Sequence, residues 1–240
     1  MRQVIQGIYL GHINYSESSV IGRFYTRQFG KRSFIIKGAK SKKSKIAPLL
    51  QSLNEVEITS NFQEEKNLNL SFGVHMDFHH TSLATDIRKG TIAMFMAEIL
   101  NKSIIEEEPN PMLYGFVQGS IRKLEQQEFS PHFHLLFLIE YSLFLGFYPR
   151  TSPVKSNEYF NLSDGIFEHE NYKSPFHLSA IASTHLSGIL SYGETYFEDS
   201  QVSKLDRIEL LNGLVRYFEI QLGLKSGSFK SHSVLQTIFA

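Results

Sequence analysis

The feature that most constrains the fold of this chain is a change of hydrophobic period close to residue 80. Before it, β-branched and aromatic residues alternate with polar ones, as in Glu55–Thr59, a pattern typical of half-buried strands. After it, apolar residues such as Ile92, Phe95 and Ile99 recur at helical spacing. One regular element cannot follow both periods, so the sequence predicts two domains, 1–80 and 81–240.

The first domain is predicted to be a small β-barrel. Phe29-Gly30-Lys31 is a turn signal between two of its strands. The expected strands lie near 4–10, 20–26, 33–36, 55–59 and 68–78. Five short strands in this length fit the OB-fold. The fold class is therefore α+β, with an N-terminal five-stranded OB-fold barrel followed by an all-helical domain.

The helices of the second domain are predicted from their start signals. Asp86 and Asn110-Pro111 are expected to cap two helices, and Ser130-Pro131 to open a third. This third helix, 132–145, is apolar nearly all round and should lie at the centre of the bundle. Further helices are expected at 178–190, 203–222 and 231–239. Residues 147–176, which are rich in Pro, Ser, Asn and Gly, are expected to form an irregular excursion.

Composition excludes several classes of protein. The chain has no cysteine, which rules out disulfides and thiolate metal sites, and we expect no metal or cofactor. The most apolar run, 133–145, is too short to span a bilayer, and the N-terminus lacks the apolar run of a signal peptide. We therefore expect a cytoplasmic protein without a membrane partner. No nucleophile, zinc-protease or phosphate-loop motif occurs, so the sequence predicts a binding protein rather than an enzyme.

Positive charge is concentrated in one segment, although the formal net charge is zero. No acidic residue lies between Glu17 and Glu55. The cations of this segment are Arg23, Arg27, Lys31, Arg32, Lys37, Lys40, Lys42, Lys43 and Lys45. Such a cluster favours a polyphosphate partner, because each neutralised phosphate releases condensed counterions. A solvated loop, or a surface for acidic protein or lipid, is the alternative interpretation.

Aromatic residues are interleaved with these cations. They are Phe24, Tyr25, Phe29 and Phe34. In an OB-fold, exposed aromatics beside a basic groove are typical of single-strand binding by base stacking. Phe24 and Phe34 are better suited to the barrel core than to stacking, and we expect them there.

A second candidate for DNA contact lies near the end of the chain. Lys230 and His232 flank Ser231 at the predicted start of the last helix. Free N–H groups and the helix dipole at such a position favour an anion. Capping of the helix is the alternative role.

Several segments together resemble the RecO family. The N-terminal segments are Gly7–Leu10, Tyr15–Ser19, Tyr25-Thr26 with Phe29-Gly30, and Lys37–Ser44, which stands at the position of the family's basic loop. The helical segments are 86–89, 106–111, 133–149, 210–218 and 229–235. Their order and spacing over nearly the whole chain carry the resemblance, since no single segment is decisive.

The resemblance implies an OB-fold joined to a helical domain, with roles in DNA repair, DNA damage and DNA recombination. Family members bind single- and double-stranded DNA, anneal complementary strands and help RecR load RecA. They also bind the acidic, apolar-ended C-terminal tail of single-stranded-DNA-binding protein. Localisation is then cytoplasmic, with association to the nucleoid during action on DNA. An adaptor that docks RecR and this tail, with little DNA binding of its own, is the alternative function.

Candidate residues for partner binding are the cations of the helical domain. They are Arg88, Lys89, Lys123, Arg216 and Lys225. Many family members also hold zinc through four cysteines in the excursion. Here cysteine is absent, so zinc is not expected, and packing by Tyr159, Phe160 and Phe167 is expected to stabilise this region instead.

Overall fold

The computed structural model describes residues 2–105, 107–150, 158–169 and 176–239. The chain forms two compact units, Met1–Phe129 and Ser130–Ala240. We call them the barrel unit and the helical unit, and each is described by itself.

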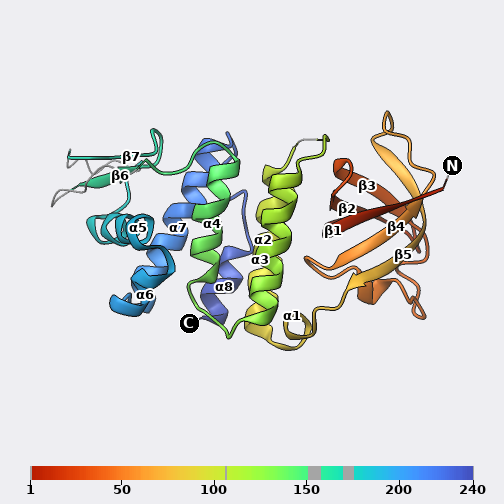
Figure 1. Ribbon diagram of the computed structural model, residues 1–240, viewed down its shortest axis with the longest axis horizontal. Helices are drawn as coiled ribbons and strands as arrows, with labels where there is room; N and C mark the ends of the chain where they lie inside the picture. The colour runs from red at the N-terminus through yellow and green to blue at the C-terminus, as the bar shows by residue number, and fades with distance from the viewer. Residues whose placement is uncertain (1, 106, 151–157, 170–175, 240) are drawn as a thin grey trace. The chain divides into compact units, whose positions relative to one another are not determined.

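The barrel unit begins with a closed five-stranded barrel (Figure 1). Its strands are β1 Gln3–Asn14, β2 Val20–Thr26, β3 Gly30–Ile36, β4 Glu55–Ser60 and β5 Leu68–Phe78. They follow the order β1-β2-β3-β5-β4, and β1 pairs with both β2 and β4. The only parallel pair in this described barrel joins β3 to β5. The predicted OB-like barrel is therefore confirmed.

The barrel core explains why β2 and β3 are rich in aromatic and β-branched residues. Phe24 and Phe34 are completely buried and meet edge to face, with their ring centroids 5.9 Å apart. Gly22 makes this packing possible, because a Cβ there would lie 2.7 Å from the Phe24 ring and 2.8 Å from Ile36 Cδ1. The prediction that Phe24 and Phe34 belong to the core is confirmed.

Three helices complete the barrel unit: α1 Thr81–Thr85, α2 Ile87–Ser103 and α3 Pro111–Gln126. The predicted caps are confirmed, since the Asp86 side chain accepts from Arg88 N and the Asn110 side chain accepts from Leu113 N. A short 3-10 helix, η1 Ala47–Leu49, precedes β4. Because α2 packs against β1, the compact unit extends to Phe129, well past the change from strand to helix. The predicted domain boundary at residue 80 stays a prediction.

A buried carboxylate ties the barrel to α3. Glu55 on β4 accepts hydrogen bonds from Arg122 Nε at 3.2 Å, Arg122 Nη2 at 3.0 Å and the Gln118 amide. His80 Nε2 lies 3.4 Å from the same carboxylate. The carboxylate is thus fully partnered although Glu55 is only 1% exposed.

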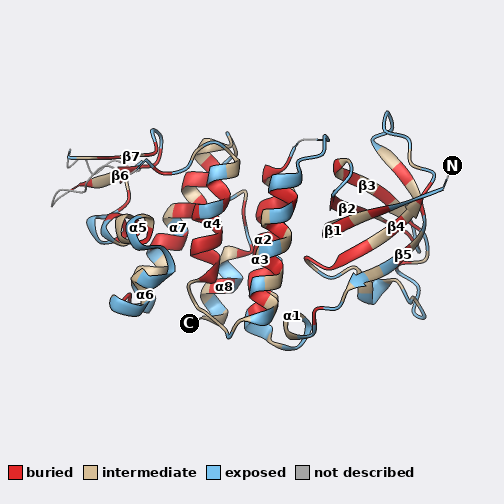
Figure 2. Ribbon diagram, viewed as in Figure 1, coloured by how far each residue is buried: buried red, intermediate tan, exposed pale blue. Residues whose placement is uncertain are grey.

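The helical unit surrounds α4 Phe133–Phe144 with α5 Ala180–Tyr192, α6 Tyr196–Asp199, α7 Lys204–Gln221 and α8 His232–Ile238. A 3-10 turn, η2 Gly193–Thr195, joins α5 to α6. Figure 2 shows α4 buried along most of its length, which confirms its predicted central position. The predicted helix start at Ser130-Pro131 is wrong in detail. The N-cap position is His132, and the Ser130 hydroxyl instead accepts from His132 N at 3.3 Å within a turn.

The excursion contains a two-stranded sheet, β6 Tyr159–Asn161 and β7 Ile166–Glu168, where the sequence predicted only irregular structure. Phe160 and Phe167 are buried and their ring centroids lie 5.1 Å apart, which confirms the expected packing; Tyr159 is half-buried. The remaining parts of the excursion, 151–157 and 170–175, lie outside the described residues. Within the described chain, no helix is both long and apolar enough to span a membrane.

Candidate nucleic-acid interface

The cations of the basic segment fall into two groups in the structure. Lys31 is half-buried and Arg32 is buried, and Arg23 on β2 is half-buried. The exposed cations are Arg27, Lys37, Lys40, Lys42, Lys43 and Lys45. Five of these six lie in residues 37–45, which we call the basic loop.

The basic loop is a series of hydrogen-bonded turns. It begins at Gly38, whose φ of 72° lies in the left-handed region that favours glycine. Ser41 N donates to Gly38 O at 3.2 Å, and Ser44 N donates to Ser41 O at 2.9 Å. Lys40 N donates to Ser18 O at 3.1 Å, which ties the loop to the β1–β2 turn. Backbone hydrogen bonds within the loop and to Ser18 therefore hold its shape, while its lysine side chains are exposed to solvent.

Lys31 and Arg32 have partners inside the barrel unit. The Lys31 ammonium donates to Ile104 O at 2.8 Å and to Asn101 O, both at the end of α2. Arg32 donates from Nη1 to Glu107 Oε2 at 2.6 Å and from Nη2 to Glu107 O at 2.7 Å. Both cations thus join β3 to the α2–α3 connection. Lys31 and Arg32 therefore have structural roles, unlike the exposed cations of the basic loop.

The aromatics of the basic segment are covered by other parts of the barrel unit. Tyr25 is buried like Phe24 and Phe34, and Phe29 packs on Phe62 at a ring-centroid distance of 4.2 Å. The exposed aromatic on a barrel strand is instead Phe72 of β5, which was not among the predicted candidates. Its only sequence signal is the loose alternation of residues 68–78.

Lys230 and His232 lie in the helical unit, whereas the basic loop lies in the barrel unit. Lys230 is exposed, and its carbonyl accepts from the Ser233 hydroxyl at 2.7 Å. His232 is half-buried at the first position of α8. The Ser231 carbonyl accepts from Val234 N at 3.1 Å, and the Ser231 side chain makes no cap bond.

The five predicted partner-binding cations are divided between the units. Lys89 is buried, and its ammonium donates to Glu125 O at 3.0 Å and Gln127 O at 2.6 Å, which is a structural role. Arg88 pairs with Asp86 at 2.7 Å, and its guanidinium lies 4.3 Å from the Phe129 ring centroid.

Of the other predicted partner-binding residues, Lys123 and Lys225 are exposed. Arg216 Nη1 lies 3.6 Å from Glu219 Oε2.

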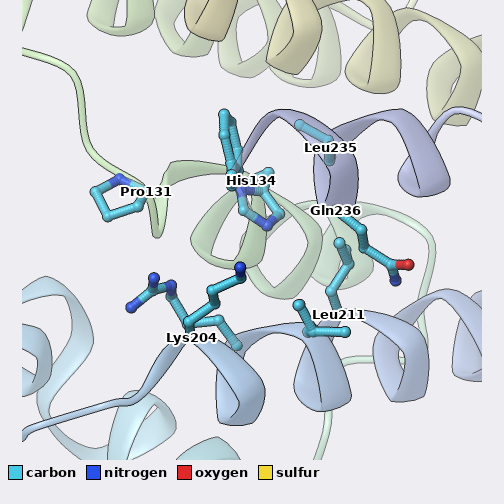
Figure 3. A pocket seen from close by; sticks show the side chains of 9 residues that line it. Pro131, His134, Lys204, Leu211, Leu235 and Gln236 are labelled. Atoms are coloured by element: carbon cyan, nitrogen blue, oxygen red, sulfur yellow. The ribbon is translucent and has the colours of Figure 1, made fainter.

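A pocket of about 270 Å³ opens among α4, α7 and α8 of the helical unit. It is lined by Pro131, His134, Lys204, Arg207, Ile208, Leu211, Leu235, Gln236 and Phe239. Figure 3 shows Lys204 and Leu211 on α7 facing His134 on α4 and Leu235 on α8. Arg207 is fixed by donation from Nη1 to Val202 O at 2.9 Å. None of the predicted partner-binding residues lines this pocket, and sequence analysis missed both of its cations.

The architecture defines a class of protein, a closed OB-like barrel that carries a cationic loop and is followed by a helical region. The family model described as "Recombination protein O N terminal" matches residues 1–71, and the one described as "Recombination protein O C terminal" matches residues 84–228. The chain belongs to the RecO family of DNA repair proteins.

Similar proteins include three that are each named DNA repair protein RecO. The one from Phocaeicola vulgatus is 34% identical over 70% of each chain. The one from Christiangramia forsetii is 31% identical over 98% of each chain, and the one from Bacteroides fragilis is 29% identical over 100% of each chain. The resemblance seen in the sequence is therefore confirmed.

Proposed function

We propose that this protein is a DNA-binding recombination mediator whose basic loop contacts the phosphates of single- and double-stranded DNA. The observation that carries the proposal is the exposure of Lys37, Lys40, Lys42, Lys43 and Lys45 on one ordered loop in a segment without acidic residues. Two phosphate chains repel each other, and a cationic surface lowers that repulsion. The same loop therefore supports strand annealing, and membership of the family supports a role beside RecR in loading RecA.

The test is fluorescence-anisotropy titration of labelled single- and double-stranded oligonucleotides over a series of salt concentrations. The triple variant Lys40→Ala, Lys42→Ala, Lys43→Ala should bind both forms of DNA more weakly. The slope of the logarithm of its binding constant against the logarithm of salt concentration should be shallower by up to about three, one for each lost phosphate contact. A matched control replaces Lys123, Lys204 and Lys225, three exposed lysines outside the loop, and should bind DNA like the unmodified protein. Equal affinities and slopes for the two triple variants would contradict a role for the basic loop.

A second candidate function is docking of an acidic, apolar-ended peptide such as the tail of single-stranded-DNA-binding protein. The α4–α7–α8 pocket supports it, because Ile208, Leu211 and Phe239 offer apolar walls beside the cations Lys204 and Arg207. Titration with a labelled acidic tail peptide tests this function. Arg207→Ala should weaken peptide binding, whereas Lys225→Ala, outside the pocket, should not.

A further inference from the structure

Phe72 occupies an irregular position of the barrel. In the β4–β5 ladder Thr59 pairs with Gly73 and Ser60 pairs with Ser71, so Phe72 is the extra residue of a β-bulge. A bulge re-aims a side chain relative to the regular alternation of a strand. Val74, two residues further on, is in the core, while Phe72 is 47% exposed. Phe72 follows buried Ser71, and the bulge returns Val74 to the core two residues later, so a large aromatic ring lies on the outside of the barrel.

A hollow lies beside this ring. The parallel pairing of β3 with β5 ends at Ile35 and Leu70, and Phe72 lies just beyond that point. The hollow, of about 540 Å³, is lined by Ile36, Lys37, Ile46, Leu70, Ser71, Phe72 and Gly73. Lys37 is the first residue of the basic loop and Ile46 follows its last residue, so the loop starts and returns at this hollow.

The charges around Phe72 are positive. The Arg2 guanidinium lies 4.9 Å from the Phe72 ring centroid, and Lys37 is an exposed residue of the hollow's lining. None of the residues that line the hollow is acidic. Arg2 thus lies over one face of the Phe72 ring, and Lys37 lines the hollow beside it. The other face of the ring and these cations match the two parts of a nucleotide, an apolar base that stacks and a phosphate that is anionic.

We propose that Phe72, together with Arg2 and Lys37, binds one unpaired base of a DNA strand whose phosphates lie along the basic loop. This inference rests on the proposed DNA-binding function and adds a preference to it. In a duplex both faces of a base are covered by neighbouring bases, so only an unpaired base can stack on Phe72. The site therefore favours single-stranded DNA, while the lysines bind either form.

A tryptophan reporter tests the site directly, because the chain contains no tryptophan. In Phe72→Trp, a single-stranded oligonucleotide should quench the tryptophan fluorescence through stacking, and a duplex of the same sequence should quench it much less. The matched control is Tyr192→Trp, at a residue that is 69% exposed in the helical unit, and its fluorescence should not change. Anisotropy of a label on the same oligonucleotide reports whether the strand is bound.

A second measurement separates base from phosphate. Phe72→Ala should weaken binding of a single strand about tenfold, the size of one lost base stack. The affinity for a strand of the same length with abasic sites should stay the same, because that strand has phosphates but no bases. Since Phe72 is on the surface, thermal melting should show that this variant folds normally.

The outcomes distinguish the two proposals. A strand that binds the Phe72→Trp variant without quenching its tryptophan, together with equal losses of affinity for normal and abasic strands on Phe72→Ala, would overturn the base site and leave the DNA-binding loop standing. Absence of DNA binding by the unmodified protein at low salt would overturn the proposed function and the base site with it. Quenching by an acidic peptide but not by a single strand would overturn the base site in favour of a protein partner.

Discussion

A buried carboxylate in the barrel unit and a buried imidazole in the helical unit are held in opposite ways. In the barrel unit Glu55 is buried as a partnered carboxylate, held by Arg122 and Gln118 of α3. In the helical unit His134 is buried with its ring centroid 5.7 Å from that of Phe239, and His132 stacks on the Phe197 ring with centroids 3.8 Å apart. The Glu55 carboxylate is thus buried as a paired charge, whereas the His134 imidazole is favoured in its neutral form.

The pKa values express this difference. Burial by itself raises the pKa of the Glu55 carboxyl, but the nearby His80 imidazole and the hydrogen bonds from Arg122 and Gln118 outweigh it and lower that pKa to about 2. Burial lowers the pKa of His134 to about 3 and that of His132 to about 4, with a further contribution from the positive charge of Arg207. As pH falls, the contribution of His134 to stability is therefore lost at a higher pH than that of Glu55.

The largest expected effect comes from removing the buried carboxylate. Glu55→Ala leaves Arg122 and His80 without their anionic partner, and we expect the free energy of unfolding to fall by about 3 kcal/mol. Urea denaturation measures it. The control is Glu57→Ala, two residues along β4 and half-buried, which should change stability by no more than about 0.5 kcal/mol. Similar losses in both variants would contradict the stabilising role of the buried Glu55 carboxylate.

Acid should distinguish the units in a second way. A histidine whose pKa is lowered on folding contributes stability that is present above its unfolded pKa of 6.5 and is lost as pH falls toward the folded value. For His134 the loss is about 2 kcal/mol by a pH of about 5. Glu55 is lowered from 4.5, so its contribution is lost only below that pH.

Urea denaturation over this pH range measures the effect. As pH falls from about 6.5 to about 5, the free energy of unfolding of His134→Leu should decrease less steeply than that of the unmodified protein. His79→Leu, at an exposed histidine, should leave the slope unchanged. An unchanged slope in His134→Leu would contradict the neutral burial of this imidazole.

A smaller effect should separate the two groups of cations in the basic segment. The Lys31 ammonium donates hydrogen bonds to the carbonyl groups of Asn101 in α2 and of Ile104 at its C-cap. Lys31→Met removes both bonds, and we expect the free energy of unfolding to fall by about 1.5 kcal/mol. Lys42→Met, at an exposed loop position, should change stability little and should weaken DNA binding. The reverse pattern would show that the structural and DNA-binding groups were assigned wrongly.

The smallest expected effect is that of a chelator. In the excursion Asn161 Nδ2 donates to Asp164 Oδ2 at 2.8 Å and to Glu168 Oε1 at 3.1 Å, and His177 bonds the same Glu168 carboxylate. These contacts and the Phe160–Phe167 packing connect the described strands of the excursion. The melting temperature should therefore be the same with and without EDTA. A clear decrease would show a metal-dependent excursion.

Features that depend on neighbouring residues were predictable from the sequence. The β-branched and aromatic residues of 20–26 and the alternation of 55–59 predicted strands that the structure contains. Asp86 and Asn110 predicted caps that form. The all-round apolar character of α4 predicted its burial. Each of these signals lies within a few residues of its effect, because strand alternation and capping are local properties of the backbone.

Only the tertiary structure decided which cations are available to a ligand. Arg32 and Lys42 look alike in the sequence, yet Arg32 reaches Glu107, 75 residues away, and Lys42 reaches solvent. The bulge at Phe72 likewise arises from the pairing of β4 with β5, which no property of Phe72 alone reveals. The physical reason is that the exposure of a side chain depends on which distant elements pack beside it, whereas periodicity records only the face on which it lies.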